Sequence, residues 1–455
     1  MERTPTGAPG HPWIDRASVN DLTVLATDHG AVPMNLGAVL TFDAPGLPSG
    51  TLHDVLGARV DRVPRLRQRL RRTPVGCGRP IWVDDSGFSV DRHIVDSPSL
   101  PVASFDSTPA AETLATAAEL VCRPLRRDRP LWLASPVIDH SGRATALIVV
   151  LHHVLADGIG GLAVLAALAD EGLTSAHMPF PQPPPNRRDL MWEANRERIA
   201  ALRGLPQRLH RDWGGLHELG VRGGGHRLAE RTSLTHPTSH ARQLATVSAP
   251  LDLVVGVAHR SGGTVNDVVL TAATGALFSI LRDRGERPAR LVVSVPISQR
   301  RGTTVEQLGN DTGVRPIAVP AVAEPADRLA AIVAVTGAAR RAPERAASAA
   351  PLGFAFRALA RLRLFDVFID HQRLVHTFVT NVRGPAEALH LAGSRIASIT
   401  PLVVTPGNVG VTFAVVSYAG QLRVAVIGDP QVVPEIGALA DRVDAELHSL
   451  GAKPA

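Results

Sequence analysis

The sequence predicts a protein of the mixed α/β class (α+β layered) with two domains. Short apolar runs of strand length alternate along the chain with longer stretches of helical periodicity, which is typical of helices layered on sheets. The chain has 455 residues, and a single hydrophobic core usually stops growing below that length. Two domains are therefore expected.

Proline and charge patterns indicate where the domains begin and end. Residues 1–17 are rich in Pro, Gly and charge and predict a flexible tail. The first domain is expected over 18–177. Five prolines between residues 178 and 185 cannot sustain a helix, so 178–232 is predicted to be a Pro-rich linker with a connecting helix. The second domain is expected over 233–455.

The first domain opens with a predicted strand at 35–42, NLGAVLTF. An arginine-rich stretch at 65–72 is interpreted as a solvated face. The other elements predicted before residue 140 are a helix at 51–62, short strands at 81–83 and 88–95, and a helix at 108–122.

The segment 147–161, LIVVLHHVLADGIGG, is the most informative part of the chain. Residues 144–151 are almost entirely apolar, which predicts a strand buried on both faces. Two adjacent histidines, His152 and His153, stand at its end. Successive strand side chains point to opposite faces, so if the strand includes both, the two imidazoles need separate roles.

An Asp-Gly pair, Asp157 and Gly158, makes the turn after the histidines, and residues 160–173 predict a helix that packs back. A carboxylate within reach of an imidazole fits an oriented general base. Two other interpretations stay open: a histidine at a strand end is more often a core or capping residue, and His and Asp are also metal ligands. No further His/Cys cluster with ligand spacing appears, so no metal ligand is assigned.

In the second domain, the apolar segment 352–368 contains Arg357, Arg361 and Arg363. One interpretation is a helix that lies on a membrane. The other is a helix that packs in the core or flanks a tunnel, because Arg363 falls away from the other two arginines on a helical wheel. The elements predicted in this domain are helices at 251–260, 265–284, 326–341, 354–368 and 433–450, and strands at 291–297, 376–385, 409–418 and 422–426.

The composition narrows the classes of function. Hydrophobic residues make up 45% of the chain and charged residues 20%, as in ordinary globular proteins. The net charge of +6 comes almost entirely from arginine, because Lys453 is the single lysine. Arginine suits a phosphorylated cofactor or an anionic membrane surface. Nucleic acid is not expected as a partner, because the arginines are scattered and lack interleaved aromatic residues.

The compartment is predicted to be the cytoplasm. Cys77 and Cys122 are too few for a disulfide framework, and the N-terminus shows no apolar signal core. No apolar stretch approaches the ~20 residues needed to span a bilayer. Contact with the inner membrane face or a lipid droplet, if it occurs, is expected to be peripheral.

Several motifs together resemble one enzyme family. HHVLADG at 152–158 matches the HHxxxDG signature of the acyl-CoA-dependent acyltransferase superfamily. The remaining motifs resemble those of the bacterial wax ester synthase/diacylglycerol acyltransferase family, in the same order over nearly the whole chain. They are PMNLG at 33–37, RPLW at 129–132, VNDVVL at 265–270, SVPIS at 294–298, LGN at 308–310 and TNVRGP at 380–385.

This resemblance implies two chloramphenicol-acetyltransferase-like domains, with mixed sheets flanked by helices and an active-site tunnel at their interface. It implies an acyl-CoA-dependent O-acyltransferase that forms triacylglycerol or wax ester from acyl-CoA and diacylglycerol or a long-chain alcohol. No bound cofactor is expected, since acyl-CoA is the co-substrate. The resemblance leaves the oligomeric state undetermined.

The resemblance also implies roles for the motif residues. His153 would be the general base, with an unperturbed pKa near ~6.5 that suits this task, while His152 packs or orients. Asp157 would hold the loop and the imidazole. Asn266 is the candidate donor to the tetrahedral oxyanion, and Asp267 beside it either belongs to the substrate site or caps its helix.

The substrate-binding wall is expected to include Gly158 and the PLW motif. Pro130, Leu131 and Trp132 would line the tunnel or pack its wall, and core packing is the stronger expectation for Trp132. Three features depart from the family pattern. Arg126 stands where an acidic residue is common, Asn35 stands where histidine is common, and the stretch 21–30, DLTVLATDHG, lacks the phenylalanine that the family often carries.

These departures leave the acceptor open. A superfamily acyltransferase acting on a non-lipid alcohol or amine is one alternative. A non-catalytic acyl-CoA- or lipid-binding paralogue is another. A serine hydrolase is disfavoured, because the sequence contains no G-x-S-x-G motif.

Overall fold

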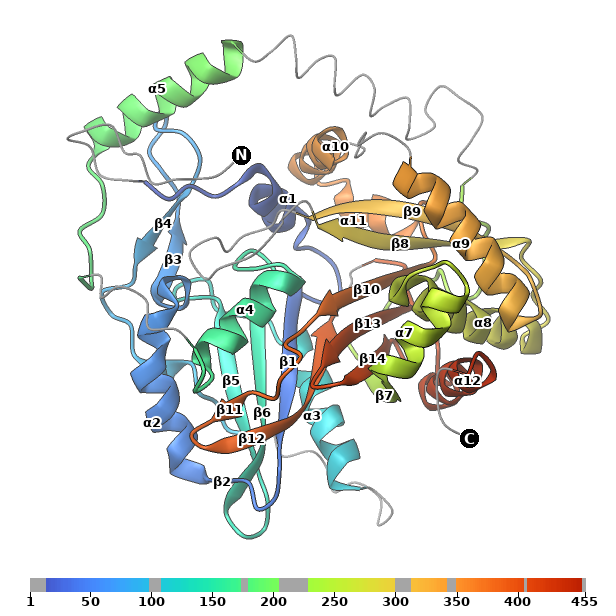
Figure 1. The fold of residues 1–455 in the computed structure, drawn as a ribbon. Coiled ribbons are helices and arrows are strands. Elements are labelled where there is room, and N and C mark those ends of the chain that lie inside the picture. Colours follow the sequence, from blue (N-terminus) through green and yellow to red (C-terminus); the bar gives the residue numbers. More distant parts are fainter. Residues whose placement is uncertain are drawn as a thin grey trace.

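Two six-stranded sheets that lie next to each other form the centre of the protein (Figure 1). The computed structural model describes residues 14–97, 108–172, 179–203, 228–298, 312–341, 349–404 and 407–451. Helices flank both sheets, so the predicted mixed α/β class is confirmed.

The first sheet is antiparallel. Its strands are β1 (Asn35–Phe42), β2 (Leu47–Pro48), β5 (Trp132–Ile138), β6 (Arg143–His152), β11 (His390–Leu391) and β12 (Ser394–Val403). They are ordered β11-β12-β1-β6-β2, with β5 also paired to β6. Nearly every residue of β6 is buried, as its apolar sequence predicts. This strand carries the first histidine of the HHxxxDG motif.

β12 belongs to the second half of the chain but pairs antiparallel with β1, with Leu36 opposite Val403. The predicted second domain, 233–455, therefore contributes two strands to the sheet of the first. Hydrophobic periodicity does not identify a strand's partner, and β12 was not among the predicted strands.

The second sheet is mixed and contains β7 (Gln243–Pro250), β8 (Arg290–Ser298), β9 (Thr312–Pro320), β10 (Thr377–Arg383), β13 (Val411–Tyr418) and β14 (Gln421–Gly428). Its order is β7-β14-β13-β10-β8-β9. β10 runs parallel to both of its neighbours, β8 and β13. The strands predicted at 291–297, 376–385, 409–418 and 422–426 all lie here.

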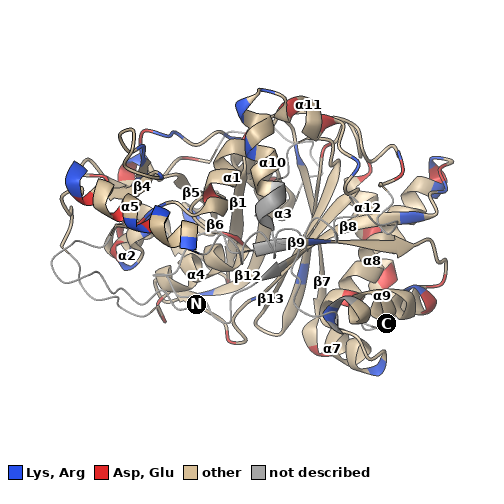
Figure 2. Cartoon of the chain, turned by 90° about the horizontal axis from the view of Figure 1, so that it is seen from above, with Lys and Arg blue, Asp and Glu red and all other residues tan. Residues whose placement is uncertain are grey.

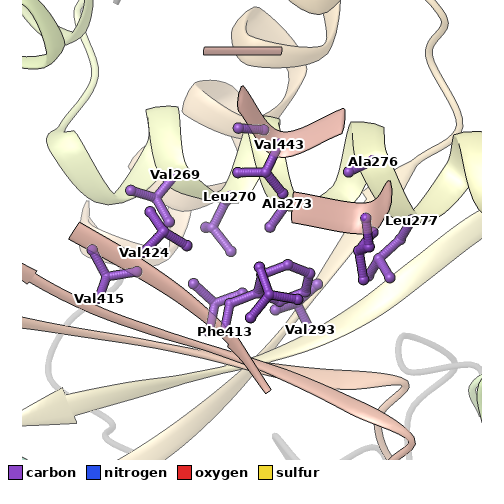
Figure 3. Packing of buried hydrophobic residues seen from close by; sticks show 14 of the residues in the cluster. Val269, Leu270, Ala273, Ala276, Leu277, Val293, Phe413, Val415, Val424 and Val443 are labelled. Carbon is purple, nitrogen blue, oxygen red and sulfur yellow. The ribbon is translucent and has the colours of Figure 1, made fainter. Parts of the chain in front are cut away.

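The core of the second half forms between this sheet and its helices, which are α7 (Leu251–Arg260), α8 (Val265–Asp283), α9 (Pro325–Arg341) and α12 (Ile436–Ser449). Leu270 and Leu277 of α8 pack toward Phe413 of β13 (Figure 3). By length and composition α8 is apolar enough to cross a membrane, so the expectation that no apolar stretch approaches this length is wrong for this helix. However, 72% of its apolar stretch is buried inside the protein.

The other helices lie around the first sheet and above the gap between the two sheets (Figure 1). They are α1 (Val19–Thr27), α2 (Ser49–Arg59), α3 (Pro109–Cys122), α4 (Gly158–Leu168), α5 (Arg187–Arg203), α10 (Ala349–Arg361) and α11 (Phe365–Asp370). A two-stranded ribbon, β3 (Gln68–Arg71) and β4 (Ile81–Asp84), completes the first half. Local caps explain several boundaries: Thr108 accepts from the N–H of Ala111 at the start of α3, and Pro109 follows it.

Two predicted elements are corrected. The strand expected at 88–95 is instead a 3-10 turn, Val90–Arg92, followed by a single bridge at Ile94. The helix expected at 354–368 is divided into α10 and α11, because Arg363 between them adopts a left-handed φ of 58°.

Two expectations about exposure are also wrong where the structure describes them. Ile14 and Ala17 are buried, so packed structure begins before the predicted end of the tail at residue 17. The arginine-rich stretch 65–72 is not a fully solvated face, because Arg65 and Arg67 are buried. Their guanidinium groups stack 4.1 Å from the ring centres of Trp82 and Phe180, respectively. The LGN motif at 308–310 and residues 1–13 lie outside the described residues.

Candidate active site

The two motif histidines lie at the end of β6, in a turn whose backbone is hydrogen-bonded to a chain segment on each side. The strand ends at His152, and His153 already belongs to the turn. The backbone N–H of His152 donates to the carbonyl of Leu131 at 2.9 Å, and that of His153 donates to the carbonyl of Met34 at 2.8 Å. The turn is therefore anchored to the PLW motif on one side and to the PMNLG motif on the other.

The imidazole of His152 is buried and locked between two partners. Its Nδ1 accepts the backbone N–H of Val154 at 3.0 Å. With Nδ1 acting as an acceptor, the proton resides on Nε2, which donates to Oδ2 of Asp28 at 3.0 Å. His152 thus holds the turn that carries His153.

Asp28 is the residue at the histidine turn that sequence reasoning missed. Besides His152, its carboxylate accepts the N–H of Met34 at 2.8 Å and forms an ion pair with Arg127. Burial would raise the pKa of Asp28, but its hydrogen bonds to His152 and Met34 and the nearby charges lower the pKa to about 2. The carboxylate is therefore ionised at neutral pH. Nothing local marks it, because it lies 124 residues from its histidine.

Asp157 holds the loop after the histidines. It is the N-cap of α4, and its Oδ1 accepts the N–H of Gly160 at 2.9 Å. The carboxylate that orients His152 is Asp28, on the segment that follows α1.

The turn faces the second half of the molecule at Gly158. A Cβ built on Gly158 would lie only 3.1 Å from Cγ2 of Val382, which belongs to the TNVRGP motif on β10. Glycine therefore permits the close approach of α4 to a strand of the other sheet. Two motifs that are more than 200 residues apart in sequence meet at this contact.

Asn266 and Asp267 begin α8. Asn266 is half-buried in the first turn of the helix, while Asp267 is fully buried. Asp267 completes a capping box with Thr264, accepting the N–H of Thr264 at 2.8 Å, and also accepts the hydroxyl of Thr336 at 2.7 Å. Its position matches the predicted capping role. α8 and α4 both contact β10.

Pro130, Leu131 and Trp132 are all buried beside β6. The indole N–H of Trp132 donates to the carbonyl of Leu66 at 2.8 Å, and its ring stacks on His93 with a centroid distance of 4.4 Å. Trp132 therefore packs in the core, which was the stronger expectation for it. Leu131 reaches the histidine turn through its backbone carbonyl.

Asn35, the departure from the family pattern, faces His152 across the β1–β6 ladder. Its side-chain amide donates to the carbonyls of Val121 and Arg123, both at 3.0 Å. Its buried Oδ1 has no hydrogen-bond partner among the described residues. Arg123 also lines a pocket of about 390 Å³ between α3 and residues 240–242, where segments of the two halves meet.

Two family signatures match the two halves of this chain. The sequence signature described as "Wax ester synthase/diacylglycerol acyltransferase catalytic domain" matches residues 18–269, and that of the "WS/DGAT C-terminal domain" matches residues 308–451. The chain belongs to the wax ester synthase/diacylglycerol acyltransferase family. It is an acyltransferase, and the resemblance drawn from the motifs is confirmed.

Known relatives of this wax ester synthase/diacylglycerol acyltransferase chain cover nearly its full length. A protein of Mycobacterium tuberculosis named as a "probable" diacylglycerol O-acyltransferase is 27% identical over 91% of this chain and 90% of its own. The wax ester synthase/diacylglycerol acyltransferase from Marinobacter aquaeolei has the same fold, with a TM-score of 0.66, 20% identity and coverage of 96% and 98% of the two chains. The first condensation domain of the CDA synthetase matches with a TM-score of 0.58, 18% identity and 97% coverage of each.

The described residues offer little support for metal-dependent chemistry or for a cysteine nucleophile. Among the described residues, no group of three or more His, Cys, Asp and Glu side chains is placed to hold a metal ion. Burial raises the pKa of the Cys122 thiol to about 11, so that thiol is protonated at neutral pH and is a poor nucleophile.

Proposed function

We propose that this protein transfers the acyl group of acyl-CoA to the hydroxyl group of diacylglycerol or a long-chain alcohol, forming triacylglycerol or wax ester. The proposal takes its substrates from the family and from relatives named for this reaction. The observation that carries it is the locked turn at the end of β6. His152, held by Asp28 and Val154, supports the turn that carries His153, and Gly158 of the same motif lies against Val382 of β10.

In the proposed reaction, the imidazole of His153 accepts the proton of the acceptor hydroxyl as its oxygen attacks the thioester carbonyl. A C–O bond forms, and a tetrahedral intermediate develops negative charge on the carbonyl oxygen. When the intermediate collapses, the C–S bond breaks, and the CoA sulfur leaves with the proton returned by His153. Base catalysis of this kind contributes about a hundred- to ten-thousand-fold in rate.

Asn266 is the proposed donor to the oxyanion. Its position in the first turn of α8 supports this role, because the unpaired N–H groups of a helix start favour negative charge. Asp267 keeps that helix start in place through Thr264 and Thr336. Leu131 supports the turn from the side of β5 through its backbone carbonyl.

The acceptor and the product are apolar lipids, so the proposal includes peripheral contact with the inner membrane face or a lipid droplet. The protein itself is proposed to reside in the cytoplasm. Acyl-CoA carries phosphate and is the soluble co-substrate. No bound cofactor is required by this chemistry, since the thioester itself activates the acyl group.

The test is a competition assay with one acyl-CoA and a mixture of fatty alcohol, monoacylglycerol, diacylglycerol and a panel of short alcohols and amines, analysed by mass spectrometry. Ester formed from diacylglycerol or fatty alcohol supports the proposal. Product formed only with a non-lipid acceptor replaces it with the non-lipid acyltransferase, and acyl-CoA binding without turnover replaces it with a binding protein. An unchanged rate in His153→Ala contradicts the assignment of the base.

A further inference from the structure

α10 lies beside α1 above the gap between the two sheets (Figure 1), and the view from above shows the same two neighbours (Figure 2). α1 belongs to the first half of the chain and α10 to the second. α10 contains Arg357 and Arg361, two arginines of the apolar segment 352–368 to which the proposed reaction gives no role. The contact between the two helices joins the two halves of the molecule.

One side of α10 is fastened to the second half through an aromatic cluster. The ring centre of Phe356 lies 5.6 Å from those of Phe365 and Phe368 on α11. α11 is in turn tied to the segment before β13, because the N–H of Asn408 donates to the carbonyl of Ile369 at 3.2 Å. α10 is therefore held as part of the second half.

A second side of α10 grips α1. Gly353 is buried there, and a Cβ at this position would lie 2.9 Å from Oγ1 of Thr23. Glycine therefore permits the two helices to approach closely. One turn further along α10, Nη1 of Arg357 donates to Oγ1 of Thr23 at 2.6 Å and to the carbonyl of Val19 at 3.4 Å.

The guanidinium group of Arg357 is half-buried, and no carboxylate among the described residues pairs with it. Burial lowers the pKa of Arg357, and no nearby charge in the described part of the chain offsets this effect. A charge that is partly desolvated without a counter-ion contributes little net stability. The contact is better explained by the position that it gives to α1.

The end of α1 that follows Thr23 leads to the residues that hold the histidine turn. Asp28 is the C-cap of α1, and its carboxylate accepts Nε2–H of His152 and the N–H of Met34. The carbonyl of Met34 accepts the N–H of His153. A displacement of α1 would therefore move the groups that hold both histidines.

We propose that Arg357 is a positioning residue for acyl transfer: by holding α1 at Thr23, it sets the carboxylate of Asp28 against His152 and thereby the place of His153. This inference rests on the proposed function, in which His153 is the base. Because α10 is anchored in the second half, the contact also couples the placement of that half to the histidine turn.

The first test is steady-state kinetics of the full chain with saturating acyl-CoA and the acceptor that the wild type esterifies. Arg357→Gln is expected to lower kcat about tenfold and to change KM less than about twofold, because a misplaced base slows the chemical step without weakening binding. Arg357→Lys keeps a charged donor and is expected to recover part of kcat. Arg361→Gln is the matched control, since Arg361 is exposed at the end of the same helix, and it is expected to retain the wild-type kcat.

Double variants test the route from α10 to the turn. Thr23→Val removes the hydroxyl at nearly constant shape, so its loss of kcat should match that of Arg357→Gln and should not deepen when the two are combined. In an Asp28→Asn background, Arg357→Gln is expected to lower kcat less than about threefold, because the route to His152 is already broken. Equal fold losses with and without Asp28 would overturn the proposal, as would an unchanged kcat or an effect on KM alone.

Hydrogen–deuterium exchange of the same variants gives a readout that needs no turnover. The amides of Met34 and Val154, which are bonded to Asp28 and His152, are expected to exchange faster in Arg357→Gln, while the amides of α8 keep their wild-type rates. Faster exchange over the whole chain would show general destabilisation and overturn the positioning role.

The two readouts separate this inference from the proposed function. A wild type that esterifies no acceptor, together with selective exchange at the histidine turn in Arg357→Gln, would remove the function and retain the link between α10 and the turn. An active wild type that Arg357→Gln matches in both kcat and exchange would retain the function and remove the link.

Discussion

The carboxylate of Asp28 accepts a hydrogen bond from Nε2 of His152 at 3.0 Å, while Nδ1 of the same imidazole accepts the N–H of Val154. This pair defines both the tautomer and the ring orientation of His152, and with them the path of the turn that carries His153.

Asp28→Asn is expected to lower kcat by up to about a hundredfold with a smaller change in KM, because misplacing a catalytic group by about an ångström has an effect of this size. The amide side chain of this variant can still contact His152, but it carries no negative charge to pair with Arg127. Steady-state kinetics with saturating acyl-CoA measure the effect. Asp128→Asn is the control, since Asp128 pairs with Arg126 on the surface; equal losses in both variants would contradict the positioning role.

Acid should remove the stability that Asp28 contributes. Its pKa falls from 3.8 to about 2 in the folded protein, so the folded state favours the ionised form. The contribution is therefore fully present above about pH 4 and disappears as the pH falls toward 2. Denaturant midpoints of the wild type and Asp28→Asn, measured across this range, should converge at low pH. A difference that stays constant down to pH 2 would refute the linkage.

Gly158→Leu is expected to force α4 away from β10, because even a Cβ at this position would lie 3.1 Å from Cγ2 of Val382. Overpacking of this kind typically costs about 1–3 kcal/mol. Adding Val382→Ala creates space and should recover part of the stability and activity. The coupling energy from thermal unfolding of the single and double variants measures the contact. Strict additivity would show that the two residues do not press on each other.

Asp267→Ala should destabilise the fold, whereas Asn266→Ala should affect catalysis. Asp267 is fully buried and accepts hydrogen bonds from Thr264 and Thr336, so its removal leaves their polar groups unpaired at a cost of about 1–3 kcal/mol. Loss of an oxyanion donor costs about a hundred- to a thousandfold in kcat. Unfolding curves and kcat for both variants separate the roles. A reversed pattern would exchange the assignments.

Local pattern was sufficient for much of the fold. The apolar run of β6 and the helical spacing of α8 are local features, because each is set by residues within one short segment. Local pattern was insufficient at 88–95, where an apolar stretch forms a 3-10 turn. It also did not reveal the left-handed Arg363 that divides α10 from α11.

By itself, then, the sequence determined the motif residues and their order along the chain, because these are properties of residue type and spacing, and the class of chemistry followed from the resemblance of those motifs to a known family. Only the tertiary structure decided which carboxylate holds His152, which strand completes the first sheet beside β1, and which helix of the second half packs on α1. Each of these depends on contacts between segments far apart in sequence, and packing and electrostatics in three dimensions select such contacts.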